Sequence, residues 1–308
     1  MIEAKRLTKR YGEKAAVDDL SFTVRPGIVT GFLGPNGSGK STTMRMIMGL
    51  DHPDSGRATV NGRPYHDLRW PLREVGALLE AKAIHPGRPA WAHLWMLAET
   101  NDIPRSRVDE VIGMVGLGSV ARQRAGRFSL GMSQRLGIAA ALLGDPGVLV
   151  FDEPVNGLDP DGIRWVRLLL RRLASEGRTV FVSSHLMSEM ALTADEVIII
   201  GRGRFLAQQP VAEITAQSAA HFVRVRSPQL EQLRSALDGD GADTAPGDDG
   251  SLTVRGIGRE AVGETAARHG IVLHELADQT ASLEEVFMEL TNSELEYSGS
   301  TGTEGGRP

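Results

Sequence analysis

A short glycine-rich run near the start of the chain has the residue types and spacing that bind phosphate. A complete Walker A loop, with the pattern G-x-x-x-x-G-K-S, is present in Gly34-Pro35-Asn36-Gly37-Ser38-Gly39-Lys40-Ser41-Thr42. Glycines let the backbone curl so that several N–H groups face a phosphate, and the helix that follows adds its N-terminus. Lys40 is then expected to reach the β- and γ-phosphates, and the Ser41 hydroxyl to bind Mg²⁺. A chance match by a glycine-rich turn is the alternative.

Two adjacent carboxylates form a second chemical motif. Asp152 and Glu153 end the apolar run Val148-Leu149-Val150-Phe151. In a Walker B strand the first acid helps to hold Mg²⁺, and the second polarises the water that attacks the γ-phosphate. Ligands of open α/β sheets bind at the carboxyl ends of the strands, which is where these acids are expected. A pair of solvent-exposed acids without such a role is the alternative.

These two motifs need a sheet to position them. The phosphate loop follows the apolar run Ile28–Leu33 and precedes a helix-compatible stretch, Thr42–Leu50. Further buried strands are predicted at Val75–Glu80 and Thr179–Ser183, with an amphipathic helix over Gly162–Ser175. Strands that alternate with helices indicate an α/β fold with a largely parallel sheet.

Other parts of the first 216 residues differ from this pattern. Residues 2–10 and 15–24 roughly alternate apolar and polar positions and are predicted as strands. From Ala90 to about Leu143 the periodicity is helical, so a helical insert interrupts the α/β pattern. Its pieces are predicted at 90–100, 105–115 and 132–143.

Composition and charge limit the class of protein. The chain has 308 residues, 41% of them hydrophobic and 24% charged, which is typical of a globular protein of about two domains. Because it has no cysteine, a disulfide framework and a thiolate metal site are excluded. The formal net charge of −5 gives no overall basic surface for nucleic acid. Apolar runs are far shorter than the ~20 residues of a membrane helix, so we expect no membrane span, and no secretion signal is predicted.

The character of the sequence changes near Gln217. Short apolar strands and helices alternate over residues 217–292, which predicts a small α+β domain. The acidic run Asp238–Gly250 resembles a calcium loop, but the residues at positions five and twelve are Ala242 and Asp249, so a solvated connecting loop is favoured. Residues 293–308 are rich in Gly, Ser and Thr and are expected to be disordered. The strands are predicted at 222–226, 252–255 and 271–276, and the helices at 230–237, 259–269 and 283–290.

Further motifs carry a resemblance to a known family. A run similar to the signature motif of ABC ATPases is Phe128-Ser129-Leu130-Gly131-Met132-Ser133-Gln134-Arg135. Asn156-Gly157-Leu158-Asp159-Pro160 resembles the D-loop, and Ser183-Ser184-His185 resembles the switch histidine. A lone histidine is usually a packed or solvated side chain, but here all the motifs occur in the order of the family. The Asn-Lys-x-Asp motif that reads guanine is absent from the sequence, which disfavours a GTPase.

The resemblance implies a role for each motif residue. The Tyr11 ring would stack on adenine, although packing at a strand end is the alternative for this residue. Glu153 would be the catalytic base, and His185 would contact the γ-phosphate. Ser41 and Asp152 would hold Mg²⁺, so the implied cofactors are ATP and Mg²⁺. The residues of the loop that would bind ATP are Gly34, Asn36, Gly37, Ser38, Gly39, Lys40, Ser41 and Thr42.

The same resemblance implies an active site shared between two chains. Ser129 and Gly131 would touch the γ-phosphate of ATP bound to the opposite subunit, with Asp159 of the D-loop in the same binding set. Each motif occurs once in this sequence, so the chain is expected to pair with a second copy of itself or with a related ATPase. A homodimer or heterodimer of this kind would hold two composite ATP sites.

Two departures from the family pattern point to a subgroup. Glu80 stands where the family has the Q-loop glutamine; its carboxylate can approach Mg²⁺ or water but donates no amide hydrogen bond. Leu130 and Met132 replace a glycine and a glutamine of the signature motif. Both departures resemble the bacterial ABC-2-type exporters that include the ATPases of bacitracin and daunorubicin resistance systems. That subgroup has a C-terminal extension that ends like Ser282–Thr291, so the resemblance covers nearly all of residues 1–292.

The implied fold is α/β, a P-loop NTPase of ABC type. It comprises a mostly parallel core sheet, an antiparallel β subdomain and a helical subdomain, plus a small C-terminal α+β domain. The ATPase domain is expected over residues 1–216, with its helical subdomain at about 85–143, and the accessory domain over 217–292.

The implied function is ATP hydrolysis that powers an exporter, with drugs or antibiotics as the cargo of the subgroup. The chain would act through a separate transmembrane permease at the cytoplasmic face of the cell membrane, and no nucleic acid partner is expected. The docking groove is expected near Glu80–Leu97, where Trp91 and Trp95 are either partner contacts or core residues of the helical subdomain.

Two other functions are weighed against the exporter. A soluble ABC ATPase that acts on ribosomes or nucleic acid generally has two fused ATPase units or a long coiled-coil insert, and this sequence has neither. A binding module that has lost hydrolysis is disfavoured because the catalytic motif residues are all present.

Overall fold

The computed structural model describes residues 1–80, 83–217, 222–247 and 250–279. The chain divides into two compact units, Met1–Pro210 and Val211–Pro308. The division lies directly after the last strand of the first unit, a few residues before the boundary at 216 that the sequence suggests. Each unit has its own hydrophobic core.

A six-stranded sheet forms the centre of the first unit. In spatial order its strands are β5 (Val75–Leu78), β6 (Val148–Asp152), β7 (Thr179–Ser184), β3 (Val29–Leu33), β8 (Glu196–Gly201) and β9 (Arg204–Pro210). The first five run parallel, and β9 is antiparallel to β8. β3, β7 and β8 are buried along their whole length. A strand that is covered on both faces has no solvent-facing side, which is why these strands are mainly apolar and do not alternate apolar and polar residues.

A three-stranded antiparallel sheet packs against the central sheet. In spatial order it consists of β2 (Lys14–Val24), β1 (Ile2–Tyr11) and β4 (Ser55–Val60). The ring of Phe22 on β2 lies 5.5 Å from the ring of Phe32 on β3, centroid to centroid. It lies 5.6 Å from the ring of Phe181 on β7. These buried aromatic side chains therefore join the two sheets in one core.

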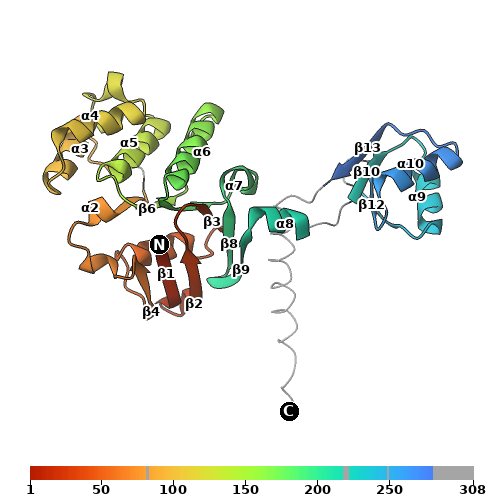
Figure 1. Ribbon diagram of the computed structural model, residues 1–308, viewed down its shortest axis with the longest axis horizontal. Helices are drawn as coiled ribbons and strands as arrows, with labels where there is room; N and C mark the ends of the chain where they lie inside the picture. The colour runs from red at the N-terminus through yellow and green to blue at the C-terminus, as the bar shows by residue number, and fades with distance from the viewer. Residues whose placement is uncertain (81–82, 218–221, 248–249, 280–308) are drawn as a thin grey trace, which may run out of the picture. The chain divides into compact units, whose positions relative to one another are not determined.

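A helical lobe lies apart from the three-stranded sheet, at the upper left of Figure 1. Its helices are α3 (Ala90–Glu99), α4 (Arg105–Met114) and α5 (Leu130–Leu142). Trp91 is buried in this lobe, and its ring stacks on that of Trp95 with 5.7 Å between the centroids. The sequence leaves open whether this pair contacts a partner or belongs to the core of the helical subdomain. Trp91 belongs to that core.

The remaining helices of the first unit cover the central sheet. α1 (Lys40–Ile47) follows the phosphate loop, while α6 (Pro160–Ser175) and α7 (Met187–Thr193) contact β3. A short helix, α2 (Pro71–Glu74), precedes β5. Within the described ranges, every helix is too short or too polar to cross a bilayer. The parallel core sheet, the antiparallel subdomain and the helical subdomain confirm the predicted α/β fold.

The second unit follows a β-α-β-β-α-β order after an initial helix, α8 (Val211–Gln217). In spatial order its strands are β11 (Asp243–Pro246), β12 (Leu252–Arg255), β10 (Phe222–Arg226) and β13 (Glu275–Gln279), and its longer helices are α9 (Leu230–Gly239) and α10 (Arg259–Arg268). Neighbouring strands are antiparallel throughout, so the unit has the split β-α-β topology. Its core joins the two helices to the sheet.

The sequence reading of the second unit is wrong in two places. The acidic run Asp238–Gly250, predicted as a connecting loop, contains the strand β11. No apolar alternation marks its four residues, and their pairing with β12 is what orders them. The last strand, predicted at 271–276, begins at Glu275. Ile271 is apolar because it packs in the core ahead of the strand, so its apolar character does not mark a strand residue. The predicted helix at 283–290 and the tail at 293–308 lie outside the described residues.

Candidate active site

The phosphate loop connects β3 to α1 through backbone conformations that need glycine. Gly37 and Gly39 have φ angles of 80° and 102°, which lie in the left-handed region. A Cβ on Gly34 would lie 2.4 Å from the Oγ of Ser38, and a Cβ on Gly39 would lie 2.4 Å from the carbonyl oxygen of Ala16. The loop is therefore packed too tightly for larger residues at these positions.

Lys40 is the first residue of α1 and is held inside the loop. Its ammonium donates hydrogen bonds to the carbonyl oxygens of Gly34 at 2.6 Å and Pro35 at 3.2 Å. The residue is only 7% exposed, and this burial lowers the pKa of Lys40, while Glu153 and Asp152 act in the opposite direction. The loop thus holds a desolvated cation, which strengthens its attraction for a phosphate.

The paired acids lie at the carboxyl end of β6, as the sequence predicts. Asp152 Oδ1 accepts a hydrogen bond from the hydroxyl of Ser183, with 2.5 Å between the oxygens. The same hydroxyl oxygen accepts a hydrogen bond from the backbone N–H of Glu153 at 3.0 Å. Ser183 is fully buried on the neighbouring strand β7. This hydroxyl therefore holds both members of the acid pair in place.

Glu153 faces the histidine that follows β7. Its Oε2 lies 2.9 Å from Nδ1 of His185. Glu153 has a φ of 50°, an uncommon conformation for a residue other than glycine, and such strain is typical of functional sites. The side chain of Glu153 is 19% exposed and that of His185 is 41% exposed, so both can reach a bound substrate.

A single pocket of about 470 Å³ brings these groups together, a size that suits a nucleotide. The Tyr11 ring lines it and is 53% exposed, so it is not packed as a strand-end residue. Glu153 and His185 also line it, as expected. The pocket-lining residues of the phosphate loop and α1 are Asn36, Gly37, Gly39, Lys40, Ser41 and Thr42.

The residues present fit a magnesium ion beside the phosphate loop. Ser41 lines the pocket, and the carboxylate of Asp152 is oriented by Ser183. Mg²⁺ prefers oxygen ligands and keeps several waters, so one hydroxyl and one carboxylate are enough ligands from the protein. No cluster of three or more His, Asp or Glu side chains able to hold a metal occurs in the described part of the chain. A site of this kind therefore depends on phosphate oxygens to complete it.

Six residues that the family resemblance assigns to ATP do not line this pocket, namely Gly34 and Ser38 of the phosphate loop and Glu80, Ser129, Gly131 and Asp159. Asp152, which the resemblance assigns to Mg²⁺, does not line it either. Ser129 is the N-cap of α5, where its hydroxyl accepts a hydrogen bond from the N–H of Met132 at 3.1 Å. Asp159 is the N-cap of α6 and accepts a hydrogen bond from the N–H of Gly162 at 2.9 Å. Both capping side chains are exposed at the start of a helix.

The signature run and the D-loop pack on each other. A Cβ on Gly131 would lie 3.2 Å from the side chain of Leu158, and a Cβ on Gly157 would lie 2.0 Å from that of Leu130. Leu130, which departs from the family signature, is 42% exposed and occupies the space beside Gly157. The starts of α5 and α6 are therefore fixed relative to each other, away from the pocket of their own chain.

Glu80 lines a different hollow, of about 410 Å³. Most of its wall is apolar, with Leu50 and Ile84 among the lining residues, and Arg45 and His93 add polar groups. The Nδ1 atom of His93 is buried and has no hydrogen-bond partner among the described residues. Burial, and then the charge of Arg88, lower the pKa of His93. The hollow coincides with part of the predicted docking segment Glu80–Leu97.

Some contributors to the site make contacts that their motifs do not reveal. Gln134, buried in α5, donates hydrogen bonds to the carbonyl oxygens of Glu153 at 3.3 Å and Asn156 at 3.4 Å. Lys14 lines the pocket from β2. Ser183 belongs to the run that resembles the switch histidine motif, but its contact with the acid pair depends on the pairing of β7 with β6, which the sequence does not reveal.

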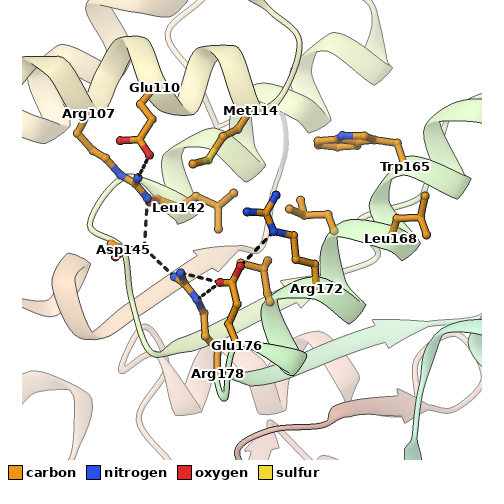
Figure 2. A pocket seen from close by; sticks show the side chains of 12 residues that line it. Arg107, Glu110, Met114, Leu142, Asp145, Trp165, Leu168, Arg172, Glu176 and Arg178 are labelled. Carbon is orange, nitrogen blue, oxygen red and sulfur yellow. Dashed lines mark hydrogen bonds and ion pairs between the residues drawn. The ribbon is translucent and has the colours of Figure 1, made fainter.

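A second hollow of similar volume, about 460 Å³, lies between α4 and α6 (Figure 2). Arg107 forms ion pairs there with Glu110 at 2.6 Å and Asp145 at 3.3 Å. Arg178 forms ion pairs with Asp145 at 2.9 Å and Glu176 at 3.0 Å. Because these guanidinium groups already face carboxylates, the hollow suits a triphosphate less well than the pocket around Lys40.

Comparison with known proteins supplies two family matches. The family described as ABC transporter matches residues 17–156, and a domain of unknown function (DUF8746) matches residues 221–284. The second match falls in the C-terminal unit.

Similar proteins cover the chain more widely. An uncharacterized ABC transporter ATP-binding protein, YhcH of Bacillus subtilis (strain 168), is 36% identical over 300 residues, which cover 96% of this chain and 97% of the relative. The bacitracin transport ATP-binding protein BcrA of Bacillus licheniformis is 42% identical over 213 residues, which cover 68% of this chain and 70% of the relative. Among solved structures, the dimeric post-hydrolysis state of the ATP-binding cassette MJ0796 bound to ADP and Pi gives a TM-score of 0.63 at 25% identity, and the match covers 68% of this chain and 99% of that chain.

Proposed function

The chain belongs to the ABC transporter family as an ATP-binding, ATP-hydrolysing subunit, and from this premise we propose that its pocket drives export through a separate membrane protein. The observation that carries the proposal is a pocket in which the phosphate loop, Glu153 and His185 meet. BcrA, a relative, is a bacitracin transport protein by name. Antibiotics or other drugs are therefore the cargo class we propose for the exporter.

ATP binding begins at the phosphate loop. Lys40 exchanges its hydrogen bonds to loop carbonyls for bonds to the β- and γ-phosphates, which the buried cation attracts. Ser41 and Asp152 would hold Mg²⁺, and that ion, when bound, neutralises phosphate charge. The Tyr11 ring at the edge of the pocket stacks on the adenine base.

Hydrolysis uses the carboxylate that follows β6. Glu153 accepts a proton from a water as the water oxygen bonds to the γ-phosphorus, and the bond from that phosphorus to the ADP oxygen breaks. His185, 2.9 Å from this carboxylate, orients it and contacts the γ-phosphate. Ser183 keeps the acid pair at the strand end during the reaction.

The site is completed by a second chain. Ser129 and Gly131 lie outside the pocket of their own chain, at the exposed start of α5. When two chains close, this helix N-terminus and the Ser129 hydroxyl stabilise negative charge on the γ-phosphate of the partner's ATP. The dimeric cassette among the solved structures supports this arrangement. The second chain is another copy or a related ATPase.

The membrane partner docks in the apolar hollow beside Glu80. Its walls offer apolar contacts, and Glu80 and Arg45, whose charges attract each other, add polar groups to the lining. Docking there would hold the chain at the cytoplasmic face of the membrane. The relatives named above are transport proteins, and they give no support to a soluble ATPase that acts on ribosomes or nucleic acid.

Co-purification with the membrane partner tests the export role. The chain is expressed in its host with an affinity tag, extracted with detergent and recovered together with a membrane protein of about six apolar segments of ~20 residues each. Leu50→Glu, in the hollow, should reduce this recovery. Leu168→Glu should not reduce it. Leu168 is as exposed as Leu50, at 58%, but lies outside the hollow beside Glu80. Recovery of the chain with ribosomes instead would contradict the proposal.

A further inference from the structure

The Tyr11 ring at the edge of the nucleotide pocket is held by a carboxylate. The hydroxyl of Tyr11 donates a hydrogen bond to Asp51 Oδ2 at 3.1 Å. The same oxygen accepts a hydrogen bond from Nε of Arg45 at 2.8 Å, and Nη2 of Arg45 lies 3.3 Å from Oδ1. The guanidinium thus contacts both carboxylate oxygens, the bidentate geometry that fixes a carboxylate in one orientation.

This carboxylate connects two parts of the fold. Arg45 belongs to α1, the helix that begins at Lys40. Asp51 follows the same helix, and the N–H of Leu50 before it donates to the carbonyl oxygen of Arg45 at 2.9 Å. Tyr11 ends β1 in the three-stranded sheet. Asp51 therefore ties the end of β1 to the helix behind the phosphate loop.

The local charges favour the same arrangement. The hydrogen bond from Arg45 is the main cause that lowers the pKa of Asp51, so this carboxyl stays ionised. Burial and the hydrogen bond to Asp51 raise the pKa of Tyr11, so its hydroxyl stays a donor. Lys9 Nζ lies over the Tyr11 ring, 5.6 Å from its centroid, and Lys9 does not line the pocket. The ring is thus contacted at its hydroxyl and on one face before any ligand is bound.

We propose that Asp51, held by Arg45, is a positioning residue for the nucleotide base, because it anchors by its hydroxyl the Tyr11 ring on which the base stacks. This inference rests on the stacking role proposed for Tyr11. A ring that is ordered in advance loses no rotational freedom when the base arrives, an advantage of roughly two- to tenfold in affinity. Asp51 itself does not line the pocket, so it acts through Tyr11.

Calorimetric titration with ADP and with pyrophosphate separates this role from a structural one. The two ligands share a diphosphate, but only ADP has a base. Asp51→Ala and Tyr11→Phe, which keeps the ring and removes the hydroxyl, should each weaken ADP binding roughly two- to tenfold. Neither should change the affinity for pyrophosphate. The ADP affinity of the double variant should equal that of the single variant with the lower affinity, since both changes remove the same contact.

Three outcomes would overturn the proposal. The first is that Asp51→Ala leaves ADP binding unchanged. The second is that Asp51→Ala weakens pyrophosphate binding as much as ADP binding, as a distorted α1 would. The third is that the losses of ADP affinity caused by Asp51→Ala and Tyr11→Phe add up in full in the double variant. Asp67→Ala, which removes an exposed carboxylate outside the pocket, is the control. Tyr11→Ala tests whether the ring stacks on the base. If this variant binds ADP as well as the wild type does, the stacking role is wrong. If Tyr11→Ala weakens ADP binding but Asp51→Ala and Tyr11→Phe do not, only the positioning role of Asp51 is wrong.

Discussion

Nδ1 of His185 lies 2.9 Å from Oε2 of Glu153, so the switch histidine and the carboxylate of the acid pair are already in contact within one chain. The signature residue Ser129 lies outside that pocket. Part of the proposed catalytic machinery is therefore assembled in the single chain, and in the proposed shared site the rest comes from a second one.

Replacing Glu153 with glutamine should stop turnover and spare binding. Glutamine has nearly the same size and can still contact His185, but its amide cannot accept the proton of the attacking water. We expect kcat to fall about 10²- to 10⁴-fold. The Kd for ATP should change by less than about threefold, or 0.7 kcal/mol. Steady-state phosphate release and calorimetry measure the two quantities, and ordinary turnover by Glu153→Gln would show that another group is the base.

Replacing Lys40 with alanine should weaken nucleotide binding itself. The change removes the buried cation of the loop, and a hydrogen bond to a charged group contributes about 1.5–3 kcal/mol, which corresponds to roughly a 10- to 150-fold rise in Kd. Titration with ADP measures it. Lys5→Ala, at a side chain 54% exposed on β1, is the matched control and should bind normally. Equal affinity of the Lys40→Ala and wild-type proteins would contradict the assignment.

Ser183→Ala should lower turnover with little effect on nucleotide affinity. It removes the hydroxyl that bonds both Asp152 and the N–H of Glu153. Loss of a group that orients such ligands typically costs 10- to 100-fold, so we expect kcat to fall by about that factor. Ser184→Ala is the control, because that buried hydroxyl accepts from the N–H of Leu186 instead. An equal loss in both variants would mean that the effect is general destabilisation of β7.

His93 should make the fold sensitive to mild acid. Burial lowers the pKa of His93, so the folded protein keeps it neutral at a pH where the unfolded chain, with a pKa near 6.5, takes up a proton. The unfolded state then binds more protons, and stability falls as the pH drops below about 6.5. His93→Gln should therefore lose less thermal stability between about pH 7.5 and 5.5 than the wild type does. His66→Gln, at a side chain 72% exposed, should behave like the wild type. Identical pH profiles for His93→Gln and the wild type would refute the account.

Local sequence patterns predict those parts of the site that depend on local backbone geometry. The spacing of Gly34, Gly37 and Gly39 predicts a tight loop, because a Cβ has no room at Gly34 and Gly39, and the backbone at Gly37 is left-handed. An apolar run that stops at Asp152 reports a strand end. Both features can be recognised within about ten residues, without knowledge of the sheet order.

Contacts between distant segments cannot be read in this way. Ser183 meets the acid pair because β6 and β7 are neighbours in a sheet whose spatial order differs from the chain order. Asp51 meets Tyr11 because the end of α1 lies beside the end of β1. The strand β11 exists because β12 pairs with it, although its own residues have no apolar alternation. Each of these depends on tertiary packing, which periodicity does not encode.

A mixing experiment tests most directly whether ATP is hydrolysed at a site shared by two chains. Ser129→Arg blocks the signature surface, and Glu153→Gln removes the base, so each variant alone should be inactive. A mixed dimer would have one intact site, formed by Glu153 of one chain and Ser129 of the other. Equal mixing should restore about one quarter of the wild-type rate, because half of the dimers are mixed and each has one of two sites intact. If the purified wild-type chain hydrolyses ATP by itself and the mixture hydrolyses no more ATP than the two variants do separately, the shared site is contradicted.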